Sequence, residues 1–175
     1  MKKSIFFLSF FLSFFLLSYS QNGYLYYRDQ FKGGVSCDGY SPNAGSGGTG
    51  NININIAAGS TIKKAFLFAG RQGIAQNVNI VFDGNNLLFD STNQITNDFF
   101  STFGGNSALH MIEVTQYVLP SQNNYQLIIP QQSTNTSNRY TDFYLYVAYE
   151  NNLLNEVTTN IYLNKIGFNN DVRTY

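Results

Sequence analysis

Charged side chains are scarce in this 175-residue chain, in which Lys, Arg, Asp and Glu together make up only 11% of the residues. A typical soluble domain has about a quarter of such residues. Basic and acidic residues number 10 each, so the formal net charge is zero. Electrostatics therefore favours neither nucleic acid nor an anionic membrane surface as a partner. Asn, Gln, Ser, Thr and Gly supply the polarity instead, as is common in exported β-proteins.

Cysteine and histidine are nearly absent, with one residue of each. Because Cys37 is the only cysteine, an intrachain disulfide is excluded and the core must hold the fold together. The only histidine, His110, lies in a segment whose alternating pattern predicts a strand. A Cys37–His110 nucleophile pair would require these two distant residues to meet in space, and we assign a catalytic role to neither.

Motifs for metals and cofactors are also missing. The ten acidic residues are scattered, and none forms a calcium loop of the D-x-D-x-D-G type. The segment Gly45–Gly50 is glycine-rich, but it lacks the Lys-Ser/Thr ending of a phosphate-binding loop and precedes a predicted strand, so we interpret it as a flexible connector. We predict no catalytic residue, metal or cofactor. Two carboxylates that meet in space as a glycosidase acid and base are the alternative.

One long apolar run is present, at the N-terminus. Lys2 and Lys3 precede Ile5–Leu17, which is interrupted only by two serines, and the small residues Ser18 and Ser20 follow. This order of charged, apolar and small residues is typical of a cleavable secretory signal peptide. The apolar run, about a dozen residues, is short for a membrane-spanning helix. We predict a signal peptide over residues 1–20 and no membrane-spanning segment in the mature chain; an uncleaved N-terminal anchor is the alternative.

The rest of the chain has the period of β-structure. Ile52, Ile54 and Ile56 alternate with asparagines, which predicts a strand with one buried face. Asp83-Gly84 between two apolar runs predicts a hairpin turn. Further patterns complete a set of predicted strands over 51–56, 61–69, 78–82, 87–89, 108–114, 125–129, 142–149 and 157–163, with one helical turn over 115–119 and long loops over 33–50 and 131–141.

No stretch keeps an apolar helical period, and strands recur every ten to fifteen residues. These features predict a single all-β domain over residues 21–164, an antiparallel β-sandwich of jelly-roll or immunoglobulin-like topology. An up-and-down barrel also fits the pattern. We interpret residues 165–175 as a C-terminal tail or the start of a linker.

Several side chains are candidates for ligand binding or modification. Aromatic rings on a sandwich can stack on sugar rings, although most tyrosines in such a chain belong to the core. We take Tyr24, Tyr26 and Tyr140 as the candidate stacking residues. Asn135 begins an N-glycosylation sequon, and Ser91 lies in Asp-Ser-Thr, which matches a short O-glycosylation signal of exported Bacteroidota proteins.

Four segments carry a resemblance to a known family. They are Ile62–Gly70, Val78–Gly84, Glu113–Val118 and Leu145–Asn151. In this order they resemble the patterns I-K-K-A-x-L-x-x-G, V-x-F-N-G, D-V-T-x-x-V and L-x-V-x-Y-E-N of the N-terminal β-sandwich domain of uncharacterised exported and cell-surface proteins of Bacteroidota. Asp83 stands where the family has Asn, and Glu113 where it has Asp. The resemblance implies a sandwich fold and an exported protein, and it carries no catalytic residues.

Three functional classes follow from these observations. The leading expectation is a non-catalytic secreted or cell-surface domain with a structural or adhesive role, because no nucleophile, base and orienting group are encoded together. A carbohydrate-binding module and a secreted glycoside hydrolase-like enzyme are the alternatives. The expected partners are surface polysaccharide or other surface proteins, in the extracellular medium, at the cell surface or in the periplasm. The sequence leaves the oligomeric state open.

Overall fold

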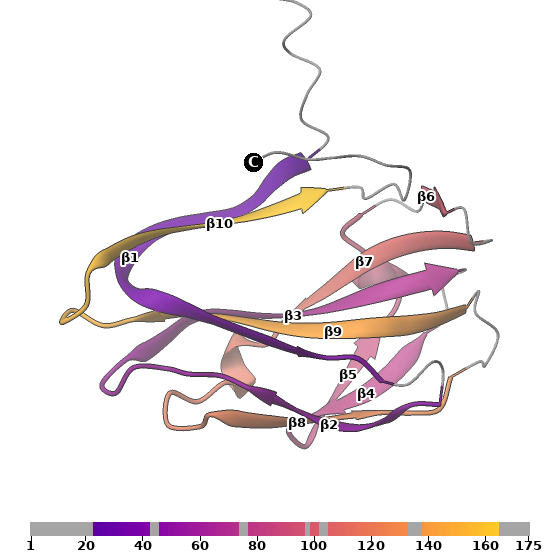
Figure 1. Cartoon of the computed structure of the whole chain (residues 1–175), viewed down its shortest axis with the longest axis horizontal. Coiled ribbons are helices and arrows are strands. Elements are labelled where there is room, and N and C mark those ends of the chain that lie inside the picture. Colours follow the sequence, from indigo (N-terminus) through magenta and orange to yellow (C-terminus); the bar gives the residue numbers. More distant parts are fainter. Residues whose placement is uncertain are drawn as a thin grey trace, which may run out of the picture.

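The structure, a computed structural model, describes residues 23–42, 46–73, 77–96, 99–101, 105–132 and 138–164. In these residues the chain forms ten strands and two short 3₁₀ helices (Figure 1). In chain order they are β1 (Gly23–Tyr40), β2 (Gly48–Asn53), β3 (Thr61–Gly73), β4 (Val78–Phe82), β5 (Asn85–Phe89), η2 (Ser91–Asn93), β6 (Phe99–Ser101), β7 (Gly105–Glu113), η3 (Thr115–Tyr117), β8 (Asn124–Ile129), β9 (Asn138–Glu150) and β10 (Glu156–Asn164).

The strands form two antiparallel sheets. The larger sheet has the order β10-β1-β9-β3-β7-β6, and the smaller has the order β2-β8-β4-β5. The larger sheet curls into a half-barrel while the smaller packs against one of its faces (Figure 1). The prediction of an all-β, antiparallel sandwich-like fold is confirmed. The predicted signal peptide and the C-terminal residues 165–175 lie outside the described residues.

The half-barrel arises because β1 folds back on itself. Its first half pairs with β10, from Gly23 opposite Asn164 to Lys32 opposite Glu156. Its second half pairs with β9, from Gly33 opposite Glu150 onward. Near the bend, the Gly33 N–H donates to the Asn155 carbonyl at 3.1 Å. As a result, β10 and the first half of β1 form a two-stranded ribbon that lies over the face of the larger sheet turned away from the smaller sheet (Figure 1).

The core fills the space between the two sheets. Alternate residues of β3 and β9, among them Leu67 and Leu145, face Ile80 and Phe82 of β4 and Tyr125 of β8. The rings of Phe82 and Tyr125 are stacked, with centroids 5.5 Å apart. Burial alternates along β8, where Tyr125, Leu127 and Ile129 are buried and the residues between them are exposed, as expected for a strand with one buried face.

Most of the predicted strands are found within a few residues of their predicted limits. The Asp83-Gly84 hairpin is confirmed: both residues have positive φ values, 47° and 80°, and Phe82 pairs with Asn85 across the turn. The helical turn predicted before Pro120 is the 3₁₀ helix η3. Two strands, β1 and β6, were not predicted from the sequence.

The loop predicted over residues 33–50 is wrong, because its ends belong to β1 and β2. The connector interpretation of Gly45–Gly50 fails for the same reason, since Gly48 and Gly50 are strand residues under the ring of Tyr40. A Cβ atom on Gly50 would lie 2.3 Å from that ring, so the ring occupies the space of a side chain. The other predicted loop, 131–141, is also too long, because β9 begins at Asn138.

The open side of β2 is capped by side chains of β1. The Asp38 carboxylate accepts from the Asn53 N–H at 2.7 Å, and the Ser36 hydroxyl accepts from the Asn55 N–H at 2.9 Å. These bonds satisfy backbone groups that a sheet edge would otherwise expose to another chain. They also join the second half of β1, in the larger sheet, to the chain of β2 in the smaller sheet.

In the part of the chain that the structure describes, no helix has the length and apolar character needed to cross a membrane.

Candidate functional site

The face of the larger sheet that points away from the smaller sheet, here called the outer face, is lined with aromatic residues. Phe66 of β3 and Tyr146 of β9 are paired across strands, and their rings are stacked with centroids 6.2 Å apart. Tyr27 of the β1–β10 ribbon meets Phe66 edge-on at 5.6 Å. The Tyr146 hydroxyl also forms a hydrogen bond with the hydroxyl of Thr159 on β10. The ribbon therefore covers this part of the outer face and buries it.

The next row of the same face is more open. Tyr144 pairs with Gly39 of β1 on one side and with Phe68 of β3 on the other. A Cβ atom on Gly39 would lie 2.6 Å from the Tyr144 ring, so one side of the ring rests against the β1 backbone. The Tyr144 side chain is nevertheless 51% exposed. A ring that is held from one side and open on the other is the geometry of a stacking platform.

Polar groups flank this platform. Asp142 lies two residues before Tyr144 on β9, and burial together with the charge of this carboxylate raises the pKa of the Tyr144 hydroxyl. The Asp142 carboxylate accepts from the Ser41 hydroxyl at 2.5 Å and from the Thr141 hydroxyl at 2.8 Å. A carboxylate and hydroxyls beside an exposed ring are suited to a ligand with one apolar face and a rim of hydroxyl groups.

The predicted stacking residues are placed differently from one another. Tyr26 is 39% exposed and meets Phe66 edge-on at 6.3 Å, so it is partly available on the ribbon. Tyr24 is the second residue of β1, at the start of the ribbon, and its side chain is not among those that the structure describes. Tyr140 is a correction: it is 1% exposed and packs in the core, because the irregular pairing near Gly70 turns it inward. Its ring cannot stack on a ligand from solution.

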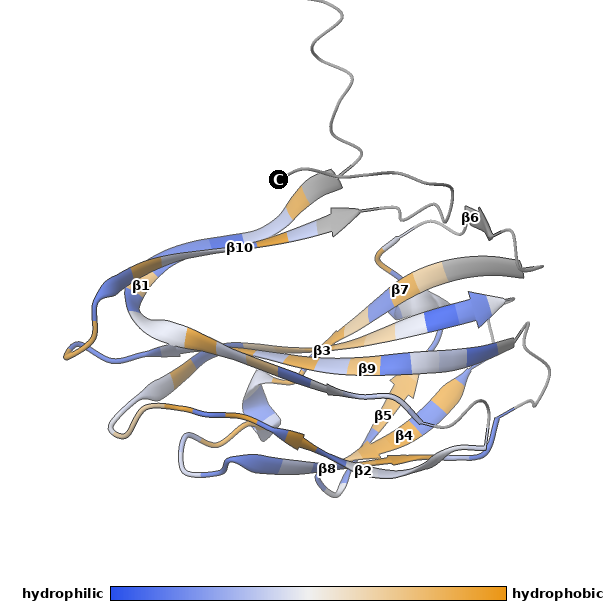
Figure 2. Ribbon diagram, in the orientation of Figure 1, coloured by the Kyte–Doolittle hydropathy of each residue, from blue (hydrophilic) through white to orange (hydrophobic). Residues whose placement is uncertain are grey.

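A polar cluster lies in the core at the end of β3, where Figure 2 shows the strand turning hydrophilic. Arg71 is 2% exposed, and its Nε–H donates to His110 Nε2 at 3.1 Å. Its terminal NH1 group donates to the Gly73 carbonyl at 2.6 Å. Because Arg71 can only donate, His110 Nε2 accepts, and the Nδ1–H of His110 donates to the Asp90 carbonyl at 2.8 Å.

The cluster extends to Tyr140, whose ring meets His110 edge-on at 5.1 Å. Burial raises the pKa of the Tyr140 hydroxyl to about 12. The hydroxyl is buried, and no described residue forms a hydrogen bond with it. His110 thus has both ring nitrogens bonded within the core, and it acts as a packing and hydrogen-bonding residue between β3, β7 and η2.

Cys37 and His110 do not meet. Cys37 pairs with Tyr146 in a row of the outer face, whereas His110 pairs with Ala69 in a row that faces the smaller sheet. Two strands, β9 and β3, also separate β1 from β7 in the sheet order. Cys37 is exposed along its strand, yet partial burial raises the pKa of its thiol. This is the opposite of the shift that activates a nucleophilic cysteine.

A slow reaction of Cys37 with thiol reagents is therefore expected. A raised thiol pKa lowers the thiolate fraction at neutral pH, and only the thiolate attacks iodoacetamide. The rate against pH should be shifted to higher pH in the folded protein, relative to the same protein in urea. Alkylation quenched at a series of times and followed by mass spectrometry measures the rate against pH for the folded protein and for the protein in urea. A folded-state rate at pH 7 above that of the unfolded chain would contradict this assignment.

Charged groups of the outer face are joined in ion pairs. Lys63 lies 3.4 Å from Asp29 and also contacts Glu150, and its ammonium lies 5.3 Å from the centre of the Phe31 ring. On β3 the Lys64 ammonium, 2.7 Å from Glu113, holds the pKa of that carboxyl below its usual range. Asp29 and Glu150 thus come together on either side of one lysine, which forms an ion pair with each. Among the described residues no three His, Cys, Asp or Glu side chains cluster as a metal site would require.

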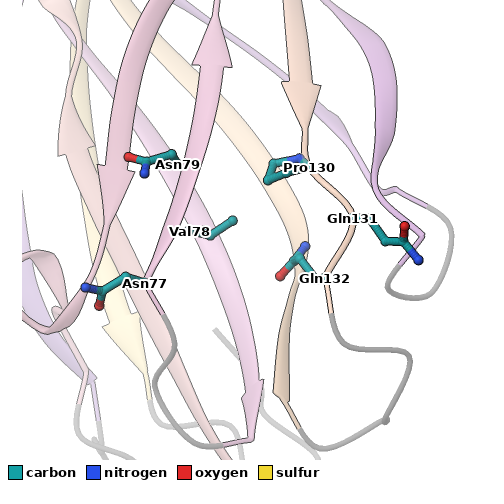
Figure 3. Close-up of a pocket in the computed structure, with 6 residues that line it drawn as sticks. All are labelled: Asn77, Val78, Asn79, Pro130, Gln131 and Gln132. Carbon is teal, nitrogen blue, oxygen red and sulfur yellow. The ribbon is translucent and has the colours of Figure 1, made fainter.

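A second surface feature is an amide-lined depression beside the start of β4. It has a volume of about 330 Å³ and is formed by Asn77, Val78, Asn79, Pro130, Gln131 and Gln132 (Figure 3). The Gln132 side chain is hydrogen-bonded within the fold. Its amide nitrogen donates to the Tyr140 carbonyl at 3.1 Å, and its amide oxygen accepts from the Tyr140 N–H at 2.7 Å. The exposed amides of Asn77, Asn79 and Gln131 remain as hydrogen-bonding groups around it.

Of the two predicted glycosylation positions, the structure describes only Ser91. Ser91 is exposed at the start of η2, directly after Asp90, whose carboxylate accepts from the Thr92 N–H at 2.8 Å. Hydrogen bonds from Thr92 lower the pKa of the Asp90 carboxyl. Asn135 lies outside the described residues.

Comparisons with known proteins give no relatives for this chain. No protein-family model matches it. Searches of curated proteins and of solved structures likewise find no match.

Tyr144 was not singled out from the sequence. Its strand is apolar on both faces, so the period-two pattern did not distinguish a covered row from an open one. Gly39, two residues after Cys37, was the available signal, because a strand glycine often marks a place where another group approaches closely.

Proposed function

We propose that this chain is an exported, non-catalytic β-sandwich domain with an adhesive or structural role at the cell surface or in the surrounding medium. One observation carries the proposal: the histidine is bonded within the core, and the carboxylates nearest to each other on the outer face are ion-paired with a lysine. His110 is bonded through both ring nitrogens, and Lys63 joins Asp29 and Glu150. The exposed faces instead present tyrosines, amides and hydroxyls, which suit binding.

The exported location is supported by the sequence. Lys2, Lys3 and the apolar run Ile5–Leu17 have the order of a secretory signal, and Ser20 is a suitable residue for cleavage. A low charge density with many amides and hydroxyls also fits a domain that meets other surfaces outside the cytoplasm. Surface polysaccharide and other surface proteins are the proposed partners.

The proposal is tested in the cell that makes the protein. Fractionation with an antibody should find the chain outside the cytoplasm, with an N-terminus at Gln21. Deletion of the gene should reduce adhesion or surface assembly, and a wild-type copy should restore it. Accumulation of an uncleaved chain in the cytoplasm would contradict export, and a polysaccharide-hydrolysing activity of the purified protein would contradict the non-catalytic role in favour of a glycoside hydrolase-like enzyme.

A second candidate function, carbohydrate binding, is favoured by the Tyr144 platform. Sugar rings have one apolar face that stacks on an aromatic ring, and their hydroxyls bond carboxylates, amides and hydroxyls. Tyr144 supplies the ring, while Asp142 and Ser41 supply acceptor and donor groups nearby. This interpretation moves the sugar-binding residue from the buried Tyr140 to the neighbouring exposed row.

Substitution of Tyr144 tests this second function. If a neutral polysaccharide binds at the platform, Tyr144→Ala should weaken binding about tenfold, which corresponds to about 1.4 kcal/mol. Tyr144→Phe keeps the ring and should retain most of the affinity. Leu153→Ala is the control, because Leu153 is 93% exposed between β9 and β10 and lies outside this row. Glycan-array screening followed by titration calorimetry measures the series, and equal binding by wild type and Tyr144→Ala would reject the platform.

A further inference from the structure

The two sheets have four edges, which are β10 and β6 in the larger sheet and β2 and β5 in the smaller. Three of them are short or protected. β6 has three residues and β5 has five, and the side chains of Asp38 and Ser36 bond the last N–H of β2 and the N–H of Asn55 just after it. Short strands and side-chain caps are the usual means by which proteins prevent their edges from pairing with another chain.

β10 lacks these protections. It is nine residues long and reads Glu-Val-Thr-Thr-Asn-Ile-Tyr-Leu-Asn, with no lysine, proline or glycine. Its single charge, Glu156, is at the first position. Its one partner among the described strands is β1, and no described residue pairs with its other side. A long edge that is rich in β-branched residues and has its one charge at the end is a template for a further strand.

The hydrogen-bonding groups on the open side can be assigned from the register. Gly33 donates to Asn155, so this pair is hydrogen-bonded, and bonded pairs alternate along an antiparallel ladder. Val157, Thr159 and Ile161 therefore direct their backbone groups toward β1. Thr158 and Asn160 direct their N–H and C=O groups to the open side, and their side chains are exposed.

We propose that the open side of β10 is a self-association edge, at which two copies of this chain pair antiparallel around a two-fold axis. The strand is complementary to itself in this arrangement. When Asn160 faces Asn160 of the second copy, Thr158 faces Tyr162, an aromatic and β-branched pair that stabilises antiparallel strands. The two Glu156 side chains lie at opposite ends of the pairing, so no like charges meet.

The charge of the whole molecule supports a second copy as the occupant. Ten basic and ten acidic residues leave the full chain without net charge, and removal of residues 1–20 would leave a formal charge of −2. Two such molecules do not repel one another strongly. The pairing would extend the half-barrel from one molecule into the next through main-chain hydrogen bonds. The inference does not depend on the proposed adhesive function.

Analytical ultracentrifugation of the exported protein, from about 1 µM to about 1 mM, tests the inference. The wild type should form dimers as the concentration rises. Asn160→Pro removes an N–H from the open side only, and it should raise the dimer dissociation constant at least about tenfold. Asn160→Ala keeps the N–H and is the matched control, with wild-type association. Thermal unfolding shows whether each variant is folded.

Thr158→Lys provides an independent variant, because a lysine on the open edge opposes pairing without removing a backbone group. If Asn160→Pro fails to fold, the behaviour of Thr158→Lys decides. A wild type that stays monomeric throughout the concentration range would overturn the inference. So would folded Thr158→Lys that dimerises as well as the wild type, since the contact would then lie elsewhere on the molecule.

Discussion

Replacement of Gly33 by alanine is expected to cost about 3 kcal/mol of the free energy of unfolding, and to be among the most damaging single substitutions in the chain. An added Cβ atom would lie 1.9 Å from the backbone carbonyl oxygen of Tyr149. No rotamer change can relieve this overlap, because the backbone fixes the position of the Cβ atom and the oxygen belongs to the main chain. The strands must separate at the point where β1 leaves β10 and joins β9.

The effect should reach beyond the site of the substitution. At the bend, the Gly33 N–H donates to the Asn155 carbonyl, and the Asn151 N–H donates to the Lys32 carbonyl at 2.9 Å. Both hydrogen bonds require the backbones to approach closely. If the bend opens, the ribbon moves away from the outer face and exposes Phe66 and Tyr146. We therefore expect a dye that binds exposed apolar surface to bind more strongly to Gly33→Ala than to the wild type.

Urea unfolding followed by circular dichroism measures the loss of stability. Gly70→Ala is the matched control, because the nearest atom to its added Cβ would be the Thr141 hydroxyl oxygen at 3.5 Å, an ordinary contact. This control should lie within about 0.5 kcal/mol of the wild type. Equal midpoints for Gly33→Ala and Gly70→Ala would show that the bend tolerates a side chain and that the described approach to Tyr149 is wrong.

Replacement of His110 by alanine is expected to have a comparable cost, again about 3 kcal/mol. The substitution leaves a cavity beside Tyr140 and removes the acceptor of the Arg71 Nε–H. It also removes the donor to the Asp90 carbonyl, which helps to hold η2 against β7. A buried guanidinium that loses a partner is costly, because it keeps its desolvation cost without the hydrogen bond that offsets it.

Two further variants give this prediction its controls. His110→Gln retains a polar group of similar reach and should recover part of the lost stability. Ser91→Ala changes an exposed position on η2 and should stay within about 0.5 kcal/mol of the wild type. Urea unfolding midpoints and slopes are compared across the series. A His110→Ala protein as stable as the wild type would show that the histidine is not a structural element of the core.

Much of the fold could be predicted from the sequence because local signals coincide with the final structure. The Ile52–Ile54–Ile56 alternation is a strand followed by buried residues, and the Asp83-Gly84 turn forms because both residues accept positive φ values. β1 was missed because three glycines, Gly33, Gly34 and Gly39, interrupt its pattern within Gly23–Tyr40. These glycines serve the bend and the packing of tyrosine rings, which involve residues more than a hundred positions away.

The candidate site was predicted less well than the fold. Tyr140 and Tyr144 belong to the same strand, and the sequence favoured the first as a stacking residue. The structure buries Tyr140 and leaves Tyr144 half exposed, because pairing is irregular between Gly70 and Arg71 and this changes which residues face inward. A one-residue shift in register reverses the face of every later side chain, and no local pattern reports it.

The sequence by itself determined the period of the strands, the hairpin turn and a core without disulfides, because these depend on the chemistry of neighbouring residues. It also carries the prediction of export in residues 1–20. Only the tertiary structure decided that β1 folds back over Phe66, that His110 bonds Arg71 in the core and that one side of β10 pairs with no described strand. Each of these depends on which distant strands pair, and pairing is settled by packing of the whole sheet rather than by any one segment.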